Sequence, residues 1–202
     1  PRDYRKARIM FDAILADVPC SGEGMFRKDE GAIAEWSRQN VDNCWRLQRE
    51  IVSDIWSCLR PGGLLIYSTC TFNAHEDEEN VEWIASELGA DILSLPVEAE
   101  WGITPAVVGD IPAYRFLPGV SRSEGLFLAV LRKHGDADEA PVKEDNRKAQ
   151  RRGRGEKPAV VKTPDVQLIS PSDYAVRQGA SDTLLAVPTR WADVYDKAAA
   201  SL

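Results

Sequence analysis

The pattern of apolar and polar positions divides the first 134 residues into short apolar runs and one long amphipathic segment. Residues 11–16 and 64–69 are nearly continuous in apolar and β-prone residues, which predicts two buried strands. Between them, residues 41–59 carry apolar side chains at helical spacing, so we expect an amphipathic helix lying on the sheet. A proline–glycine segment at residues 60–63 is expected to end that helix, because proline cannot continue it.

An acidic segment follows the second predicted strand and opens a second predicted helix. Asn73 and Glu76 have the spacing of a helix-capping pair, and residues 76–79 place four acidic side chains where the helix dipole favours them. The apolar side chains of residues 81–88 form the buried face of this helix, and Gly89 ends it. The acidic run has an adequate structural explanation, so we assign it no catalytic or metal-binding role.

Two further strands are predicted at residues 114–117 and 125–131, after an irregular segment rich in proline and glycine. The connection between them is too short for a crossover helix, so this pair should be antiparallel. Strands that alternate with helices and end in an antiparallel pair are typical of a mixed, doubly wound sheet. The predicted fold class is therefore α/β.

The composition changes at the end of this sheet-forming segment, which predicts a catalytic-type domain over residues 1–134. Residues 135–163 are charged and lack apolar periodicity, so we expect a disordered linker. Its basic residues are either a solubilising tether or a contact to RNA. Residues 164–202 regain strand patterns at 166–169 and 183–187 and then a helical pattern. So short a segment rarely builds an independent core, and we predict the beginning of a small C-terminal domain.

Charge and cysteine usage narrow the class of protein. The net charge of −7 argues against indiscriminate binding to nucleic acid over the whole surface, although a local basic track remains compatible with it. We expect the basic residues among the first eight to form a solvated arm. No apolar run is long enough to span a membrane. The cysteines form no C-x-x-C pair and no metal-ligand spacing with the two histidines, so we expect free thiols in a reducing cytoplasm. They are Cys20, Cys44, Cys58 and Cys70.

Each of the first two predicted strands runs into a loop that holds a cysteine. The segment D-V-P-C-S-G-E-G, residues 17–24, follows the first strand and contains Cys20. The segment S-T-C-T, residues 68–71, follows the second strand and contains Cys70. Loops directly after buried strands are where α/β enzymes place their chemistry. By position alone, Cys70 fits a small apolar filler as well as it fits a reactive thiol.

Taken together, the two loops resemble those of the NOL1/NOP2/Sun family of RNA cytosine-5 methyltransferases, whose two cysteine motifs correspond to Pro19-Cys20 and Thr69-Cys70. Residues 61–63 are similar to the lead-in to the second strand, and residues 122–129 to the last strand of the sheet. The resemblance covers residues 9–133 and is closest to the bacterial branch that methylates small-subunit ribosomal RNA. It implies the C-terminal half of a Rossmann-like, mostly parallel methyltransferase sheet with an antiparallel last strand, followed by the start of a small α+β extension.

The same resemblance implies roles for three residues. Cys70 would be the nucleophile that adds to C6 of the target cytosine, Cys20 would assist the release step, and Asp17 would contact the cofactor, S-adenosylmethionine. A thiolate suits the addition because it is strongly nucleophilic and its pKa responds to local electrostatics. The implied partner is RNA, with ribosomal RNA of the small subunit as the expected substrate, and no membrane is involved.

Two other interpretations stay open. The chain could be a non-catalytic RNA-binding or scaffold protein that keeps a methyltransferase fold, or a thiol redox protein that uses the two loop cysteines. The lack of a C-x-x-C motif weakens the second. The sequence also lacks a phosphate loop and a strand followed by G-x-G-x-x-G. In the family the glycine-rich loop and the acidic ribose-binding position would precede Pro1, so we expect this segment alone to be inactive.

Overall fold

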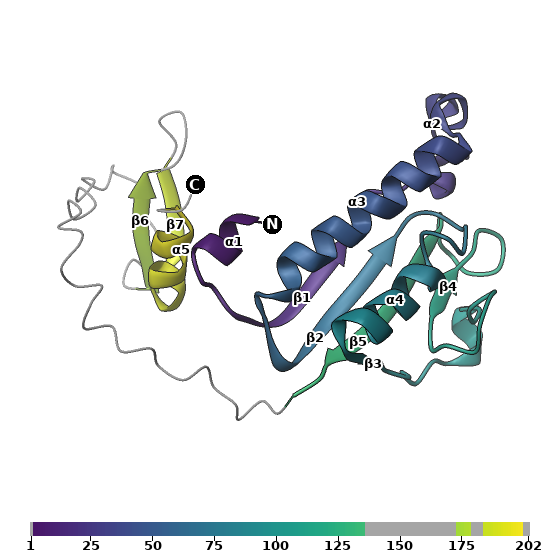
Figure 1. The fold of residues 1–202 in the computed structure, drawn as a ribbon. Helices are drawn as coiled ribbons and strands as arrows, with labels where there is room; N and C mark the ends of the chain where they lie inside the picture. Colours follow the sequence, from purple (N-terminus) through teal and green to yellow (C-terminus); the bar gives the residue numbers. More distant parts are fainter. Residues whose placement is uncertain (1, 136–172, 179–183, 200–202) are drawn as a thin grey trace. The chain divides into compact units, whose positions relative to one another are not determined.

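A computed structural model of the chain describes residues 2–135, 173–178 and 184–199 (Figure 1). The chain divides into two units, Pro1–Glu139 and Ala140–Leu202, which are described separately. In the first unit the helices are α1 Arg2–Lys6, η1 Glu23–Met25, α2 Glu30–Glu35, α3 Arg38–Trp56, α4 Glu78–Leu88 and η2 Ala99–Trp101. Its strands are β1 Phe11–Asp17, β2 Leu59–Thr69, β3 Ala90–Ile92, β4 Tyr114–Phe116 and β5 Leu126–Lys133.

The strands of the first unit form one mixed sheet in the order β1-β2-β5-β3, with β4 also paired to β5. Strands β1 and β2 are parallel, whereas β5 is antiparallel to β2, β3 and β4. The two strands predicted at residues 114–117 and 125–131 are therefore antiparallel, as expected. The α/β class and the antiparallel orientation of β5, the last strand of this unit along the chain, are both confirmed.

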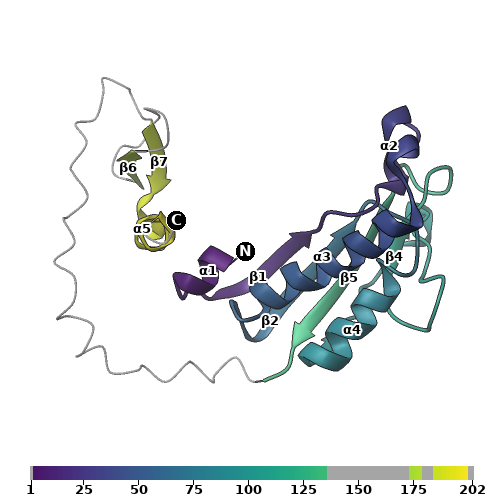
Figure 2. The ribbon, with the colours of Figure 1, turned by 45° about the horizontal axis from the view of Figure 1, so that its top comes forward.

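Both long helices pack side by side over one face of the sheet (Figure 1; Figure 2). Helix α3 begins where the hydroxyl of Ser37 accepts a hydrogen bond from the Asn40 amide at 3.1 Å, and it buries its apolar stripe against the strands. Alternate residues of β2 and β5 complete this core because successive side chains of a strand point to opposite faces. The fully buried strand residues include Leu65, Tyr67, Phe127 and Leu131.

On the opposite face of the sheet the side chains are also apolar, but no helix of the described residues covers them. Leu15 of β1 is 67% exposed, and its parallel neighbour Ile66 on β2 is only half-buried. This face continues onto β5, where Val130 pairs with Ile66. A strand that is apolar on both faces is typical of a sheet that is covered on both sides.

The start of β2 differs from the prediction. Helix α3 ends at Trp56, and the proline–glycine segment at residues 60–63 forms the irregular beginning of a strand instead of a turn that ends the helix. The pairing with β1 jumps from Phe11↔Leu59 to Ala13↔Leu64, and Gly62 adopts a φ of 72° within this bulge. Strand β3 was not expected either, because three residues are too few to show a periodic pattern.

The basic residues at the N-terminus are not the solvated arm expected from the sequence. Residues Arg2–Lys6 form the short helix α1, which lies against α3. Arg2 pairs with Glu50 and, at 2.9 Å, with Asp54, and Arg5 lies 3.3 Å from the other oxygen of Asp54. Two of the basic side chains are thus paired with carboxylates of α3, although both remain exposed to solvent.

The acidic run follows the expectation only in part, because Glu78 and Glu79 lie in the first turn of α4 whereas Glu76 and Asp77 precede the helix. The helix begins only at Glu78, and the carboxylates of Asp77 and Glu78 are buried beside Arg115 of β4. The Arg115 guanidinium donates to both oxygens of Glu78, at 2.9 and 2.5 Å, and lies 3.1 Å from Asp77. Burial raises the pKa of Asp77 to about 8, although Thr69 donates to it and Arg115 is near. One buried cation therefore lies against two buried carboxyl groups.

The second unit contains the hairpin of β6 Tyr174–Gln178 and β7 Leu184–Pro188, followed by η5 Thr189–Trp191 and α5 Ala192–Ala199. Arg177 of β6 donates to both carboxylate oxygens of Asp196 on α5, at 2.7 and 2.9 Å. The strand predicted at 183–187 and the helix after it are confirmed. The strand predicted at 166–169 and the linker beyond residue 135 lie outside the described residues. In the described part of the chain, no helix combines the length and apolarity that crossing a bilayer requires.

We predict that Arg115→Met lowers the free energy of unfolding by about 3–5 kcal/mol, because it leaves a buried carboxylate without its cation. Denaturant unfolding followed by circular dichroism measures the change. Arg122→Met is the matched control, since Arg122 is exposed and its replacement should change stability by less than about 0.5 kcal/mol. Equal effects of the two changes would contradict a structural role for the buried cluster.

Candidate active site

The two cysteine loops leave the sheet at the same edge. Strands β1 and β2 run parallel with Asp17 opposite Ser68, so the loops that follow them are neighbours. The Sγ atoms of Cys20 and Cys70 lie 3.2 Å apart, and the Cys70 amide donates to Cys20 Sγ at 3.3 Å. Both are free thiols that are only partly buried. The structure therefore brings Cys20 and Cys70 into direct contact.

The contact makes the two thiols unequal. A hydrogen bond from the Cys20 thiol lowers the pKa of Cys70 to about 7, against the opposing effects of burial and of the Asp17 charge. The same contact, together with burial, raises the pKa of Cys20, which keeps its proton. Cys70 is the less buried of the two, so water stabilises its thiolate better. The contact therefore favours the thiolate form at Cys70 and the protonated form at Cys20.

Residues next to the cysteines tie the two loops together. The hydroxyls of Ser21 and Thr71 share a hydrogen bond of 2.9 Å, and the Gly24 amide donates to the Cys70 carbonyl at 2.8 Å. No side chain fits at Gly24, because a Cβ there would lie 2.6 Å from the Cys70 carbonyl oxygen and 3.3 Å from that of Gly125. The glycine is thus needed for the close approach of the two loops.

Beneath the loops lies a cluster of buried polar side chains that sequence reasoning did not connect to the site. The carboxylate of Glu76 accepts hydrogen bonds from the Ser21 amide at 3.0 Å, from Gln48 Nε2 at 2.6 Å and from Asn73 Nδ2 at 2.8 Å. Asn73 Oδ1 accepts from the Glu76 amide at 2.9 Å, as the predicted pair requires, but the pair lies in the turn that precedes α4 and does not cap the helix. The capping signal was visible in the sequence, but the partners on the Cys20 loop and on α3 were not.

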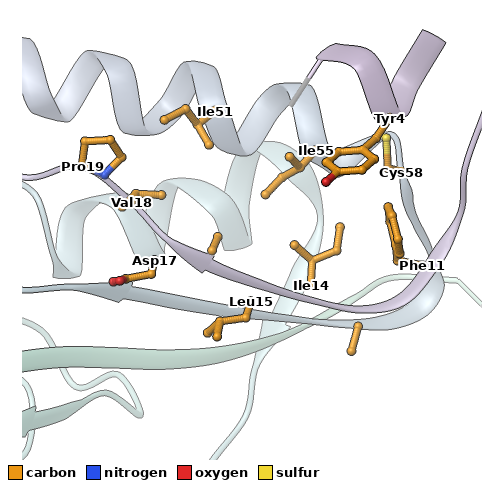
Figure 3. Close-up of a pocket in the computed structure, with 12 residues that line it drawn as sticks. Tyr4, Phe11, Ile14, Leu15, Asp17, Val18, Pro19, Ile51, Ile55 and Cys58 are labelled. Atoms are coloured by element: carbon orange, nitrogen blue, oxygen red, sulfur yellow. The ribbon is translucent and has the colours of Figure 1, made fainter. Parts of the chain in front are cut away.

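Asp17 ends β1 at the same edge as the two thiols. Its Oδ1 accepts a hydrogen bond from the Ser68 hydroxyl at 2.9 Å, and its side chain is exposed. A groove of about 430 Å³ runs along β1, with Ile14 and Ile55 on the helix side and Leu15 on the other side (Figure 3). The described residues contain no group of histidine, cysteine or acidic side chains suited to a metal ion.

These residues fit part of a site for S-adenosylmethionine. A carboxylate at a strand end accepts hydrogen bonds from hydroxyl or ammonium groups, and Asp17 uses only one oxygen for the contact with Ser68. The groove beside it is lined mainly by apolar side chains. Asp17 and the adjoining groove would hold one side of the cofactor.

Solved structures with the same fold define the class of protein. The chain is similar to the crystal structure of NSun6 from Pyrococcus horikoshii with SFG, with a TM-score of 0.57 and 29% sequence identity. The match covers 67% of this chain and 33% of the NSun6 chain. A methyltransferase homolog protein from Pyrococcus horikoshii is similar over 64% of this chain and 41% of its own, with a TM-score of 0.54 and 28% identity. The fold is that of a Rossmann-like methyltransferase.

Sequence comparisons narrow the class to a family. The family model described as 16S rRNA methyltransferase RsmB/F matches residues 2–132, and the chain belongs to this family. Ribosomal RNA small subunit methyltransferase F of Cronobacter sakazakii is 38% identical over 132 residues, which are 65% of this chain and 28% of the relative. The protein of the same name from Serratia proteamaculans is 42% identical over 127 residues, 61% of this chain and 26% of the relative. The chain thus spans about a quarter of the length of these curated relatives.

We predict that alkylation of Cys70 by iodoacetamide accelerates as the pH rises from 5 to 8 and is half-maximal near pH 7, because the thiolate is the reacting form. In Cys20→Ala the hydrogen bond to the thiolate is lost, so the midpoint should rise toward the ordinary value of a free cysteine. Mass spectrometry of the Cys70 peptide measures the rate. A midpoint that does not change in Cys20→Ala would show that the thiol contact does not set the reactivity of Cys70.

We predict that Gly24→Ala lowers the free energy of unfolding by about 1–3 kcal/mol, because backbone atoms on both sides must move to admit the methyl group. Gly31→Ala is the matched control, since the nearest atoms to its Cβ belong to the flexible side chain of Asp29. Thermal unfolding compares the two variants. A Gly24 variant as stable as the control would mean that the loops do not depend on this close contact.

Proposed function

We propose that this chain is the part of an S-adenosylmethionine-dependent RNA cytosine-5 methyltransferase that carries its two reactive cysteines, with 16S ribosomal RNA as the substrate. The observation that carries the proposal is the 3.2 Å contact of two thiols on adjacent strand ends, within a chain of the RsmB/F family. Two buried fillers would not need partly exposed sulfur atoms, or a glycine that brings their loops together. The family supports the cofactor, and the NSun6 structure contains SFG, an analogue of it.

The chemistry follows from the poor nucleophilicity of cytosine C5. The Cys70 thiolate attacks C6 and forms an S–C6 bond, and the displaced electron pair makes C5 enamine-like. S-adenosylmethionine supplies the methyl group that C5 accepts. A base then takes the C5 proton, and the electron pair of the C5–H bond re-forms the C5–C6 double bond as the S–C6 bond breaks and the Cys70 thiolate leaves. Cys20 lies beside the sulfur that leaves and assists this release step, while Asp17 contacts the cofactor at the end of β1.

The target base must reach Cys70 from outside a stacked helix. A flipped or single-stranded cytosine meets this need, and flipping costs roughly a few kcal/mol. Arg27 and Lys28 follow the Cys20 loop and are exposed, which suits contacts to the RNA backbone. Lys28 pairs with Glu124 in the free protein, so that ion pair would have to exchange for a phosphate contact. We place this activity in the cytoplasm, on RNA of the small ribosomal subunit.

A non-catalytic scaffold that keeps the fold is the competing proposal. It requires neither the lowered pKa of Cys70 nor a donor thiol beside it. A methyl-transfer assay on the full-length protein with 16S ribosomal RNA separates the two proposals, since the scaffold predicts RNA binding without turnover.

We predict opposite phenotypes for the two cysteines in the full-length protein with cofactor and RNA. Cys70→Ala should form neither methylated product nor a covalent adduct, because no thiolate remains to attack C6. Cys20→Ala should still attack and transfer the methyl group, but it should accumulate an adduct that survives denaturing electrophoresis. A gel with labelled RNA measures both.

Cys44→Ala serves as the control for these variants, since Cys44 lies on α3 and is also a free, half-buried thiol. It should behave like the wild type. An adduct in Cys70→Ala and none in Cys20→Ala would reverse the roles of the two residues. Full turnover in both variants would contradict the covalent mechanism.

A further inference from the structure

We propose that Glu76 is a positioning residue that sets the Cys20 thiol against Cys70 by holding the main chain on one side of Cys20. The inference rests on the proposed function, because it concerns the same pair of thiols. It is supported by the hydrogen bonds of the Glu76 carboxylate, a residue that belongs to neither cysteine loop.

The carboxylate of Glu76 is fully buried and bonds three parts of the site. Its Oε2 accepts from the Ser21 amide, the peptide group that follows Cys20, at 3.0 Å. The same oxygen accepts from Gln48 Nε2 of α3 at 2.6 Å. Its Oε1 accepts from Asn73, three residues after Cys70 along the chain, at 2.8 Å. One side chain thus joins the Cys20 loop, the Cys70 loop and the helix behind them.

Gln48 fixes the main chain on the other side of Cys20. Its Nε2 also donates to the Pro19 carbonyl at 2.9 Å, and its Oε1 accepts from Asn80 of α4 at 2.7 Å. Gln48 is fully buried, so water cannot replace these bonds. The peptide groups before and after Cys20 are therefore both fixed, and a shift of the loop would break at least one bond.

A capping role alone does not account for this arrangement. A capping pair would account only for the bond from the Glu76 amide to Asn73 Oδ1, and Oε1 accepts instead from the Asn73 side-chain amide. Oε2 is left for the Cys20 loop and Gln48. Among the described residues the carboxylate bonds only neutral donors and no cation, and a buried charge without a cation is costly. A glutamine or alanine at this position would avoid that cost, so the charge serves the loop contacts.

The reactivity of Cys70 reports on this positioning. If Glu76 is replaced by glutamine, an amide NH2 faces donors that previously met a carboxylate oxygen, and the Cys20 loop has to shift. The hydrogen bond from Cys20 to Cys70 is then weakened, which raises the pKa of Cys70. The Glu76 charge by itself acts in the opposite direction, because it raises the pKa of Cys70 in the native protein. Positioning and simple electrostatics therefore predict changes of opposite sign.

The test measures the pH midpoint of Cys70 alkylation by iodoacetamide in the full-length protein. We expect Glu76→Gln to move the midpoint upward by about as much as Cys20→Ala does, and Glu76→Gln combined with Cys20→Ala to move it no further. Glu79→Gln is the matched control, since it removes the same charge from an exposed site three residues away and should leave the midpoint unchanged. An unchanged or lowered midpoint in Glu76→Gln, or additive shifts in the double variant, would overturn the proposal.

Unfolding by denaturant shows whether Glu76→Gln is folded at the temperature of the assay. If Glu76→Gln is not folded, Gln48→Met tests whether these hydrogen bonds position Cys20. This change removes the donor to Pro19 and to Glu76 while the Glu76 carboxylate remains. The same upward shift is expected, and its absence would also overturn the proposal. Alkylation needs no methyl transfer, so this result is independent of the adduct experiment that tests the proposed function.

Discussion

The parallel pairing of β1 with β2 is the constraint on which the site depends. Parallel neighbours end at the same edge of a sheet, so the segments after Asp17 and after Thr69 start side by side although about fifty residues separate them in sequence. An antiparallel pair would put the two loops at opposite edges, and no local adjustment could bring the sulfur atoms together. Helix α3 is the crossover that makes the parallel pairing possible, and its buried Gln48 then reaches the loop that follows β1.

Below that edge, the protein buries charge in two different ways. Around Arg115, one guanidinium meets two carboxyl groups, and the raised pKa of Asp77 limits the excess of negative charge. Around Glu76, neutral amides alone satisfy the carboxylate. The first cluster fastens the start of α4 to β4, and Arg115 also donates to the carbonyl of Phe72 in the Cys70 loop at 3.0 Å. The second fastens the Cys20 loop. Buried polar contacts thus fix both loops, while Cys20 and Cys70 themselves stay only partly buried.

Membership of the RsmB/F family explains several features that are unusual for a small sheet. The face of β1 and β2 opposite α3 is apolar and partly open, and the groove along β1 has apolar walls on both sides of the strand. Such surfaces suit a sheet that continues beyond β1. The chain spans about a quarter of the length of the curated relatives.

The sequence by itself determined the elements with strong periodicity and the identity of the two cysteine loops. The strands β1 and β2, the helix α3 and the antiparallel pair of β4 and β5 follow from apolar spacing and connection length, which are local properties. The Pro19-Cys20 and Thr69-Cys70 motifs were readable because their residue types are specific. Strand β3, the bulge at the start of β2 and the ion pairs of α1 were not, since they depend on partners distant in sequence.

Only the tertiary structure decided what the acidic run does. From sequence, residues 76–79 looked like one helix start favoured by the helix dipole, because four adjacent acids have the same local signal. In the fold, Glu76 faces the Cys20 loop, Asp77 and Glu78 face Arg115, and Glu79 is exposed. Which donor meets each carboxylate is set by the packing of α3, β4 and the two loops around the turn. The inequality of the two thiols arises in the same way, from a 3.2 Å contact and a difference in burial that only the folded chain creates.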